Sequence, residues 1–167
     1  MVLGALRIDG SGAGGSFVTM PLDPSFVGRA YPPTPPYQVG REKIREFADA
    51  IGAADPVHRE ADKARERGYA DVIAPPTFPI VITLEAGNQI FADSELGIDY
   101  ARVVHGQQRF RYERPVVAGD RLVCVAVVED ITNRGGHDFV TTRVEVDNTE
   151  GERVVTTWTK LVIRGEE

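Results

Sequence analysis

The stretch "RLVCVAVVED", residues 121–130, decides the fold of this chain. Apolar side chains occupy both of its faces, with Val123, Val125 and Val127 on one and Leu122, Cys124 and Ala126 on the other. A strand that is apolar on both faces belongs to a sheet with neighbours above and below it. The stretch therefore predicts a sheet that one helix covers on one side and that is partly covered on the other.

Three further strand-like runs surround this one, and turn signals separate them. The four predicted strands are Arg102–Glu113, Arg121–Asp130, Asp138–Asp147 and Arg153–Arg164. The strings "PVVAGD", "NRGGH" and "NTEGE" lie between them and are rich in turn-forming residues. Short connections of this kind predict an antiparallel meander.

Helical patterns lie upstream of the strands. Ile44, Phe47, Ala48 and Ile51 have the spacing of one buried face and predict a helix over Arg41–Ile51. "VHREADKARERG", residues 57–68, predicts a short exposed helix that Gly68 ends.

A third helix is expected within "APPTFPIVITLEAGNQIF", residues 74–91. Thr77 can cap this helix, and Pro79 is tolerated in a first turn. Its apolar stripe would consist of Ile80, Leu84, Gly87 and Phe91. Residues 80–83 are all β-branched, so a strand is an alternative interpretation of this run.

Helices followed by an antiparallel meander indicate an α+β domain. We expect a single domain over residues 21–167, preceded by a glycine-rich flexible tail over residues 1–20. The proline-rich string "YPPTPP", residues 31–36, should be extended, without ladder donors, and cross the surface.

Composition excludes several classes of function. The net charge of −6 and the interleaved Lys and Arg residues argue against a nucleic-acid partner. Cys124 is the single cysteine and is expected to be a small buried hydrophobe. No apolar run is long enough for a membrane helix, and no signal sequence precedes the domain, so we expect a cytoplasmic protein without membrane insertion. We also expect no metal and no cofactor, because the histidines lack ligand spacing.

The string "FADAIGAADPVHREADKA", residues 47–64, carries a resemblance to a known family. It is similar to the signature of the (R)-specific enoyl-CoA hydratases and MaoC-like dehydratases, which have the hotdog fold, an antiparallel sheet wrapped around a central helix. The positions that match are Phe47, Gly52, Pro56, Val57, His58 and Ala64. Asp55 takes the place of the signature's Asn, and Ala53 takes the place of its catalytic Asp.

The resemblance extends over residues 22–164, through strings such as "DVIAPPTF" and "VVHGQQRFRYERPVVAGDRL". Within the family it is strongest to the N-terminal MaoC-type dehydratase domain and to the non-catalytic subunit of actinobacterial (3R)-hydroxyacyl-carrier-protein dehydratases. It implies an acyl-CoA or acyl-carrier-protein thioester as the ligand. It also implies a homodimer, or a heterodimer with a catalytic MaoC-like subunit.

Two catalytic devices of the family are absent from this sequence. Hydration of an enoyl thioester needs a water held between a carboxylate and an imidazole, and only His58 remains of that pair. A backbone amide must also face the thioester oxygen. Where the family usually has His-Gly before the central helix, this chain has Pro75–Pro76, and proline has no N–H.

Three hypotheses follow. In the first, the chain is a dehydratase subunit that shapes the acyl channel with Pro76, Thr77, Phe78, Ile82 and Leu84, while a partner supplies the catalytic residues. In the second, it is an autonomous homodimeric hydratase that uses His58 with Asp55. In the third, it is an acyl-thioester binding module without turnover.

The remaining charged and aromatic motifs have structural interpretations. In "RFRYERP", Phe110 and Tyr112 should pack on the central helix, while Arg109 and Arg111 face outward and could meet an anionic carrier or the phosphates of coenzyme A. His58 could instead bond a backbone group at the surface, and His105 is expected at a subunit edge.

Overall fold

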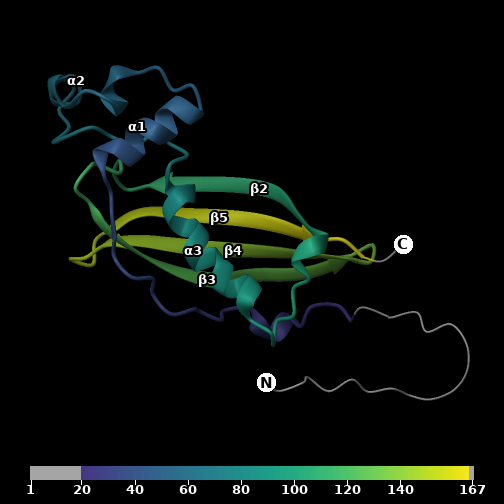
Figure 1. Ribbon diagram of the computed structural model, residues 1–167. Helices are drawn as coiled ribbons and strands as arrows, with labels where there is room; N and C mark the ends of the chain where they lie inside the picture. Colours follow the sequence, from purple (N-terminus) through teal and green to yellow (C-terminus); the bar gives the residue numbers. More distant parts are fainter. Residues whose placement is uncertain (1–19, 166–167) are drawn as a thin grey trace, which may run out of the picture.

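The computed structural model describes residues 20–165, which form a five-stranded antiparallel sheet crossed by one long helix (Figure 1). The strands are β1 (Tyr37–Gln38), β2 (Val103–Tyr112), β3 (Arg121–Arg134), β4 (His137–Asn148) and β5 (Arg153–Ile163), in the order β1-β3-β4-β5-β2. The sheet curls around the central helix, so the expected α+β hotdog fold is confirmed. The expected tail lies outside the described residues, apart from Met20.

Strand β3 is longer than the sequence predicted. It runs four residues past Asp130 because Gly135 and Gly136 turn the chain with positive φ angles of 60° and 78°. The turn places Arg134 directly opposite His137, so pairing with β4 continues to the end of the hairpin. A glycine pair of this kind gives the tightest hairpin connection.

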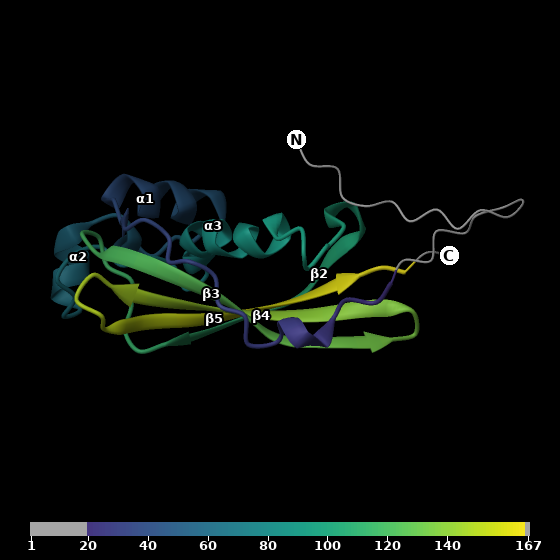
Figure 2. The same ribbon diagram turned by 90° about the horizontal axis from the view of Figure 1, so that it is seen from below.

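The central helix α3 (Pro79–Ala92) lies across one face of the sheet, and the other face has no helix of residues 20–165 on it (Figure 2). The strand interpretation of residues 80–83 is therefore excluded. The side chains that α3 buries against the sheet are Ile82, Thr83, Ala86 and Ile90. The predicted stripe of Ile80, Leu84, Gly87 and Phe91 lies beside this buried face, on the side of the helix that lines a pocket.

The start of α3 differs from the prediction. Phe78, not Thr77, is the N-cap residue, and no side chain bonds to the first turn. Thr77 is exposed, and its carbonyl accepts a bond from the amide of Ile80. Pro79 occupies the first helical position, as expected.

Helix α1 (Arg41–Ala50) packs beside the start of α3. Ile44 and Ala48 are buried, and the Phe47 ring meets the Phe78 ring edge-on with centroids 5.5 Å apart. The predicted helix is confirmed, but Ile51 follows its last turn and is 49% exposed.

The expected second helix forms as two pieces. They are a 3₁₀ turn, η2 (Pro56–His58), and a short helix, α2 (Ala61–Glu66). The break falls at Arg59 and Glu60, and Gly68 follows with the positive φ of 87° expected of a helix stop.

The proline-rich segment runs along the edge of β3. The segment is extended, as expected. The prediction that it offers no hydrogen-bond donors to the sheet is wrong, because the amides of Tyr31 and Thr34 donate to the carbonyls of Ala126 and Cys124 at 2.9 Å. The non-proline residues of "YPPTPP" thus cover one edge of the sheet. Strand β2 forms the other edge.

The core lies between α3 and the inner face of the sheet. Cys124 is buried there as a free thiol, as predicted, and its burial raises its pKa to about 12. The outer face of β3 is only half-buried, at Val123, Val125 and Val127, which agrees with the partial cover expected from the sequence. Within residues 20–165, no helix has the length and apolar character that a membrane span requires.

Candidate functional site

His58 is held inside the protein by the segment that leads into α3. Its side chain is 8% exposed, and its Nδ1 lies 2.7 Å from the carbonyl oxygen of Ile73. In return, the amide of Ile73 donates to the carbonyl of Val57 at 3.1 Å. A carbonyl oxygen only accepts, so Nδ1 carries the hydrogen and Nε2 is the acceptor of the neutral ring. The ring bonds a backbone group as one hypothesis expected, but it is buried.

The Asp55 carboxylate is engaged by groups other than His58. Oδ1 accepts the amide of Val57 at 3.1 Å, which caps η2, and Oδ2 accepts from Arg67 at 2.7 Å. The Arg67 guanidinium, and then the Val57 amide, lower the pKa of Asp55. A lowered pKa makes a carboxylate a weaker base. The His58 amide donates to the Asp55 backbone carbonyl at 3.2 Å, but among the described residues no hydrogen bond joins the two side chains.

Ala53 occupies a well-fixed position in this loop. Its amide donates to the carbonyl of Ala48 at 2.8 Å, and its carbonyl accepts from Arg59 at 2.5 Å. Arg59 also binds Asp49 at 2.7 Å. The backbone is therefore anchored, while the Ala53 side chain has no group that can exchange a proton.

The turn at Pro75–Pro76, before α3, is held by hydrogen bonds that its backbone carbonyls accept. Pro75 is buried and its carbonyl accepts the amide of Phe78, while the carbonyl of Pro76 accepts the hydroxyl of Tyr112 at 2.7 Å. Neither proline offers an N–H. Burial raises the pKa of Tyr112, whose hydroxyl is the donor in this bond.

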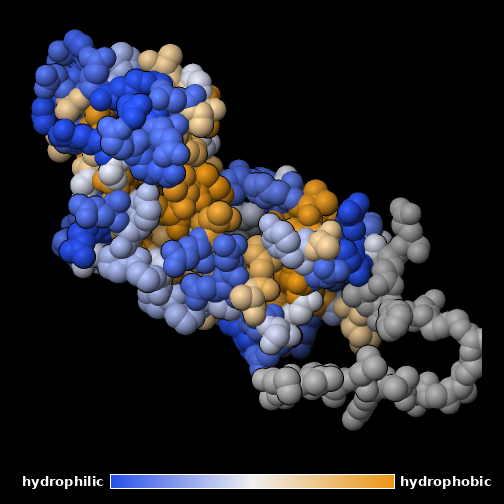
Figure 3. Space-filling view, in the orientation of Figure 1, coloured by the Kyte–Doolittle hydropathy of each residue, from blue (hydrophilic) through white to orange (hydrophobic). Residues whose placement is uncertain are grey.

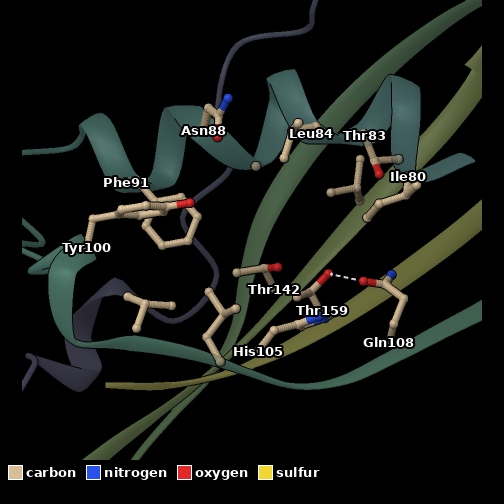
Figure 4. A pocket seen from close by; sticks show the side chains of 14 residues that line it. Ile80, Thr83, Leu84, Asn88, Phe91, Tyr100, His105, Gln108, Thr142 and Thr159 are labelled. Atoms are coloured by element: carbon tan, nitrogen blue, oxygen red, sulfur yellow. Dashed lines mark hydrogen bonds between the residues drawn. The ribbon is translucent and has the colours of Figure 1, made fainter. Parts of the chain in front are cut away.

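A pocket of about 350 Å³ lies between α3 and the floor formed by β4, β5 and β2 (Figure 4). The helix side contributes Ile80, Thr83, Leu84, Gly87, Asn88 and Phe91. The other side contributes Tyr100, Val103, His105, Gln108, Thr142, Val144, Thr159 and Leu161. Volumes of this size suit a small organic ligand or part of a chain.

An irregularity in β2 decides which side chains enter this pocket. The register shifts between His105 and Gln107, so Gly106 is an extra residue in the strand. His105 and Gln108 consequently face the pocket together, although alternation would put them on opposite faces. A glycine inside a strand pattern is the sequence signal for such a bulge. Gln108 was not identified from the sequence. His105, expected at a subunit edge, lies on β2, an edge strand of the sheet, and its place at a subunit contact stays a prediction.

The structure divides the predicted channel residues between core and pocket. Leu84 lines the pocket and is 59% exposed. Phe78 and Ile82 lie in the buried core, and Pro76 and Thr77 are exposed at the turn before α3. Within the described residues, none of the lining comes from the loop that holds Asp55 and His58.

Apolar surface gathers over α3 and towards the turn that precedes β2 (Figure 3). Leu84, Tyr100 and Val104 are large apolar side chains that remain 59%, 71% and 46% exposed. Leu84 and Tyr100 also line the pocket. The pocket mouth and the free edge of the sheet thus share one apolar region, which is typical of an interaction surface.

The predicted division of "RFRYERP" between two faces is confirmed. Phe110 and Tyr112 pack against the core, while Arg109 lies over the outward-facing Trp158 ring, with its guanidinium carbon 4.0 Å from the ring centroid. Among the described residues, no group of three or more His, Cys, Asp or Glu side chains could hold a metal ion.

Comparison with known proteins assigns the chain to a family. Residues 25–157 match a family described as "FAS1-like, dehydratase domain region". The chain belongs to this dehydratase family. The resemblance to MaoC-like hotdog dehydratases, expected from residues 47–64, is thereby confirmed.

Relatives and solved structures agree with this assignment. UPF0336 proteins from Saccharopolyspora erythraea and Streptomyces avermitilis are 56% and 57% identical, over 87% and 89% of this chain and 94% and 99% of theirs. The HadBC (3R-hydroxyacyl-ACP dehydratase) complex from Mycobacterium tuberculosis contains a chain that is 32% identical, with a TM-score of 0.75, covering 82% of this chain and 96% of that one. A MaoC-like dehydratase is 34% identical, with a TM-score of 0.77, and the match covers 84% of this chain and 43% of that one.

Proposed function

We propose that this MaoC-like chain is the acyl-binding subunit of a (3R)-hydroxyacyl-thioester dehydratase, and that a second MaoC-like subunit supplies the catalytic carboxylate, imidazole and oxyanion amide. The observation that carries the proposal is the contrast between the two regions described above. The pocket beside α3 is present, whereas the loop at residues 52–58 has an alanine where the reaction needs a carboxylate.

The local chemistry supports this division of labour. A general acid–base group contributes about 10²–10⁴ to the rate of a reaction, and one oxyanion donor about 10²–10³. Ala53 cannot supply the first and Pro75–Pro76 cannot supply the second. Asp55 is a weak substitute, because Arg67 and the Val57 amide hold its carboxylate and lower its pKa. A chain of this kind needs a partner for efficient turnover.

The free edge of the sheet supports the presence of a partner. The proline-rich segment covers the β3 edge, whereas β2 is an edge strand with Val104 and Tyr100 exposed beside it. Within residues 20–165 no further strand pairs with this edge of β2, and such an edge next to apolar side chains favours pairing with a second subunit. The similar HadBC chain belongs to a protein described as a complex.

The test is reconstitution with a MaoC-like subunit that retains the Asp-x-Asn-Pro-x-His motif. The purified pair should hydrate crotonyl-CoA and longer trans-2-enoyl-CoA substrates, whereas this chain alone should be at least 100-fold slower, the smaller end of the losses above. Ordinary enzyme rates from this chain alone would refute the proposal. Absence of activity in every reconstituted pair would favour a binding module without turnover.

Gly87→Leu separates the acyl-binding role from a merely structural one. Gly87 lines the pocket and has open space around its Cα, so a leucine side chain there fills the cavity. The reconstituted pair should keep its activity on crotonyl-CoA and lose activity on long-chain substrates. Glu85→Leu is the matched control, because Glu85 is exposed on the same helix and does not line the pocket. Equal activity of both variants on long chains would contradict the acyl-binding role.

A further inference from the structure

The floor of the pocket contains a row of polar side chains that a plain hydrocarbon ligand would not need. Thr142 of β4, Thr159 of β5 and Gln108 of β2 are direct neighbours across the three strands, because Thr142 pairs with Thr159 and Thr159 pairs with Gln108. All three line the pocket. Cross-strand neighbours on one face lie within reach of each other, so these residues form one polar row.

The rows on either side of this one are mainly apolar. On one side lie Val140, Leu161 and His105, and on the other lie Val144, Thr157 and Phe110. The polar row therefore crosses a floor whose flanking rows are mainly apolar, with His105 and Thr157 as their polar members. Figure 4 shows Thr142, Thr159 and Gln108 on the sheet side of the pocket, opposite Leu84 on α3.

Gln108 has an amide group that the protein itself leaves unsatisfied. Its Oε1 accepts the hydroxyl of Thr159 at 2.9 Å, which fixes the orientation of the side chain. Its Nε2 is buried and has no hydrogen-bond partner within residues 20–165. If the Gln108 amide is rotated by 180°, Nε2 donates to the Thr159 hydroxyl, which can also accept, and Oε1 is then the atom without a partner. In either orientation, one polar atom of the amide stays unpaired. A buried polar group without a partner costs about 1–3 kcal/mol.

A ligand that bonds to this amide removes the cost, and the bulge at Gly106 is what brings Gln108 to the pocket. We propose that the row of Thr142, Thr159 and Gln108 binds an oxygen atom carried by the acyl chain. The pocket then favours a chain with a hydroxyl or oxo substituent over a plain hydrocarbon chain. This inference rests on the proposed function, since it requires that the pocket takes an acyl thioester.

Two positions on a ligand could supply this oxygen. One is the 3-hydroxyl next to the thioester, and the other is a substituent further along the chain. Both present an oxygen that accepts from Nε2. The depth of the polar row selects between them, so thioesters with the oxygen at different positions distinguish the two.

The experiment measures dissociation constants of the purified full-length chain by isothermal titration calorimetry. The probes are decanoyl-CoA and hydroxydecanoyl-CoA isomers that carry the hydroxyl on carbon 3, near the middle of the chain or near its end. At least one hydroxylated probe should bind roughly three- to tenfold more tightly than decanoyl-CoA, the effect of one net hydrogen bond. The isomer that benefits identifies the position of the oxygen.

Gln108→Leu should abolish this preference and bind decanoyl-CoA at least as tightly as the unaltered chain does. Gln107→Leu is the matched control, because Gln107 is the adjacent glutamine and faces the outer side of the sheet. It should leave the preference unchanged. If Gln108→Leu does not fold, as judged by circular dichroism, Gln108→Met tests the same loss of the amide.

Equal binding of decanoyl-CoA and every hydroxylated probe would overturn the inference and leave the acyl-binding role intact. A preference that survives Gln108→Leu would overturn it as well. Absence of binding by all probes would overturn both the inference and the proposed acyl-binding role.

Discussion

The His58 ring and the Ile73 carbonyl are joined by a bond of 2.7 Å that fixes the ring in one tautomer. The bond connects the loop at residues 52–58 to the segment that leads into the central helix α3. A histidine that carries its hydrogen on Nδ1 presents Nε2 as an acceptor. The loop thus holds the His58 imidazole in a defined orientation, while residue 53 is an alanine and offers no carboxylate beside it.

Replacing His58 with alanine should destabilise the chain. The Ile73 carbonyl would lose its partner, which costs about 1–3 kcal/mol in the free energy of unfolding. Urea denaturation measures this difference. His58→Gln should restore part of the stability because its amide can donate to the same carbonyl. His137→Ala, at an exposed position, should have little effect, and equal stability of both alanine variants would contradict the role of the bond.

Restoring a carboxylate at residue 53 should raise the activity of the chain alone. Ala53→Asp places the missing acid–base group on an anchored backbone, and hydration of crotonyl-CoA should increase at least tenfold, below the full contribution of such a group. The rate should stay far from that of the reconstituted pair, because Pro75–Pro76 still lack amides. Ala54→Asp puts the same charge at an exposed neighbour and serves as the control. Similar rates for the two variants would show that position 53 is not special.

The bulge in β2 makes Gly106 sensitive to substitution. A Cβ atom there would lie 3.3 Å from the carbonyl oxygen of Lys160 and 3.6 Å from Cγ2 of Val162. Gly106→Ala should push β2 away from β5 and lower the free energy of unfolding by about 1 kcal/mol. Gly87→Ala should instead raise it by about 0.5–1 kcal/mol, since Gly87 lies inside a helix with open space around it. Thermal unfolding of the two variants should therefore shift in opposite directions.

Acid should weaken the attachment of the N-terminal segment to the end of α3. The Tyr31 hydroxyl and Arg29 each bind Asp93 at 2.8 Å and lower its pKa below the ordinary 3.8, although burial opposes the shift. A carboxyl with a lowered pKa stabilises the fold above the ordinary value, and this contribution is lost as the pH falls through the lowered one.

Asp93→Asn tests this contribution through urea unfolding at a series of pH values. The variant should be less stable than the unaltered chain near neutral pH, and the two should converge in acid. Glu95→Gln is the control, because Glu95 binds the same Arg29 but is 72% exposed. A constant difference at all pH values would mean that ionisation of Asp93 does not contribute.

Local sequence patterns were sufficient for the family and for most of the architecture. Alternating apolar residues and glycine turns determine the meander, because each strand and hairpin depends on neighbours within a few residues. The absence of a carboxylate at Ala53 and of amides at Pro75–Pro76 is likewise a property of the residues themselves.

Only the tertiary structure decided which side chains share the pocket. The row of Thr142, Thr159 and Gln108 depends on strand register and on the bulge at Gly106, which places Gln108 on the inner face. The division of α3 into a buried row and a pocket row depends on how the helix rotates against the sheet. These features arise from contacts between residues far apart in the chain. A local signal such as Gly106 can indicate a bulge, but it does not show which side chains meet in the pocket.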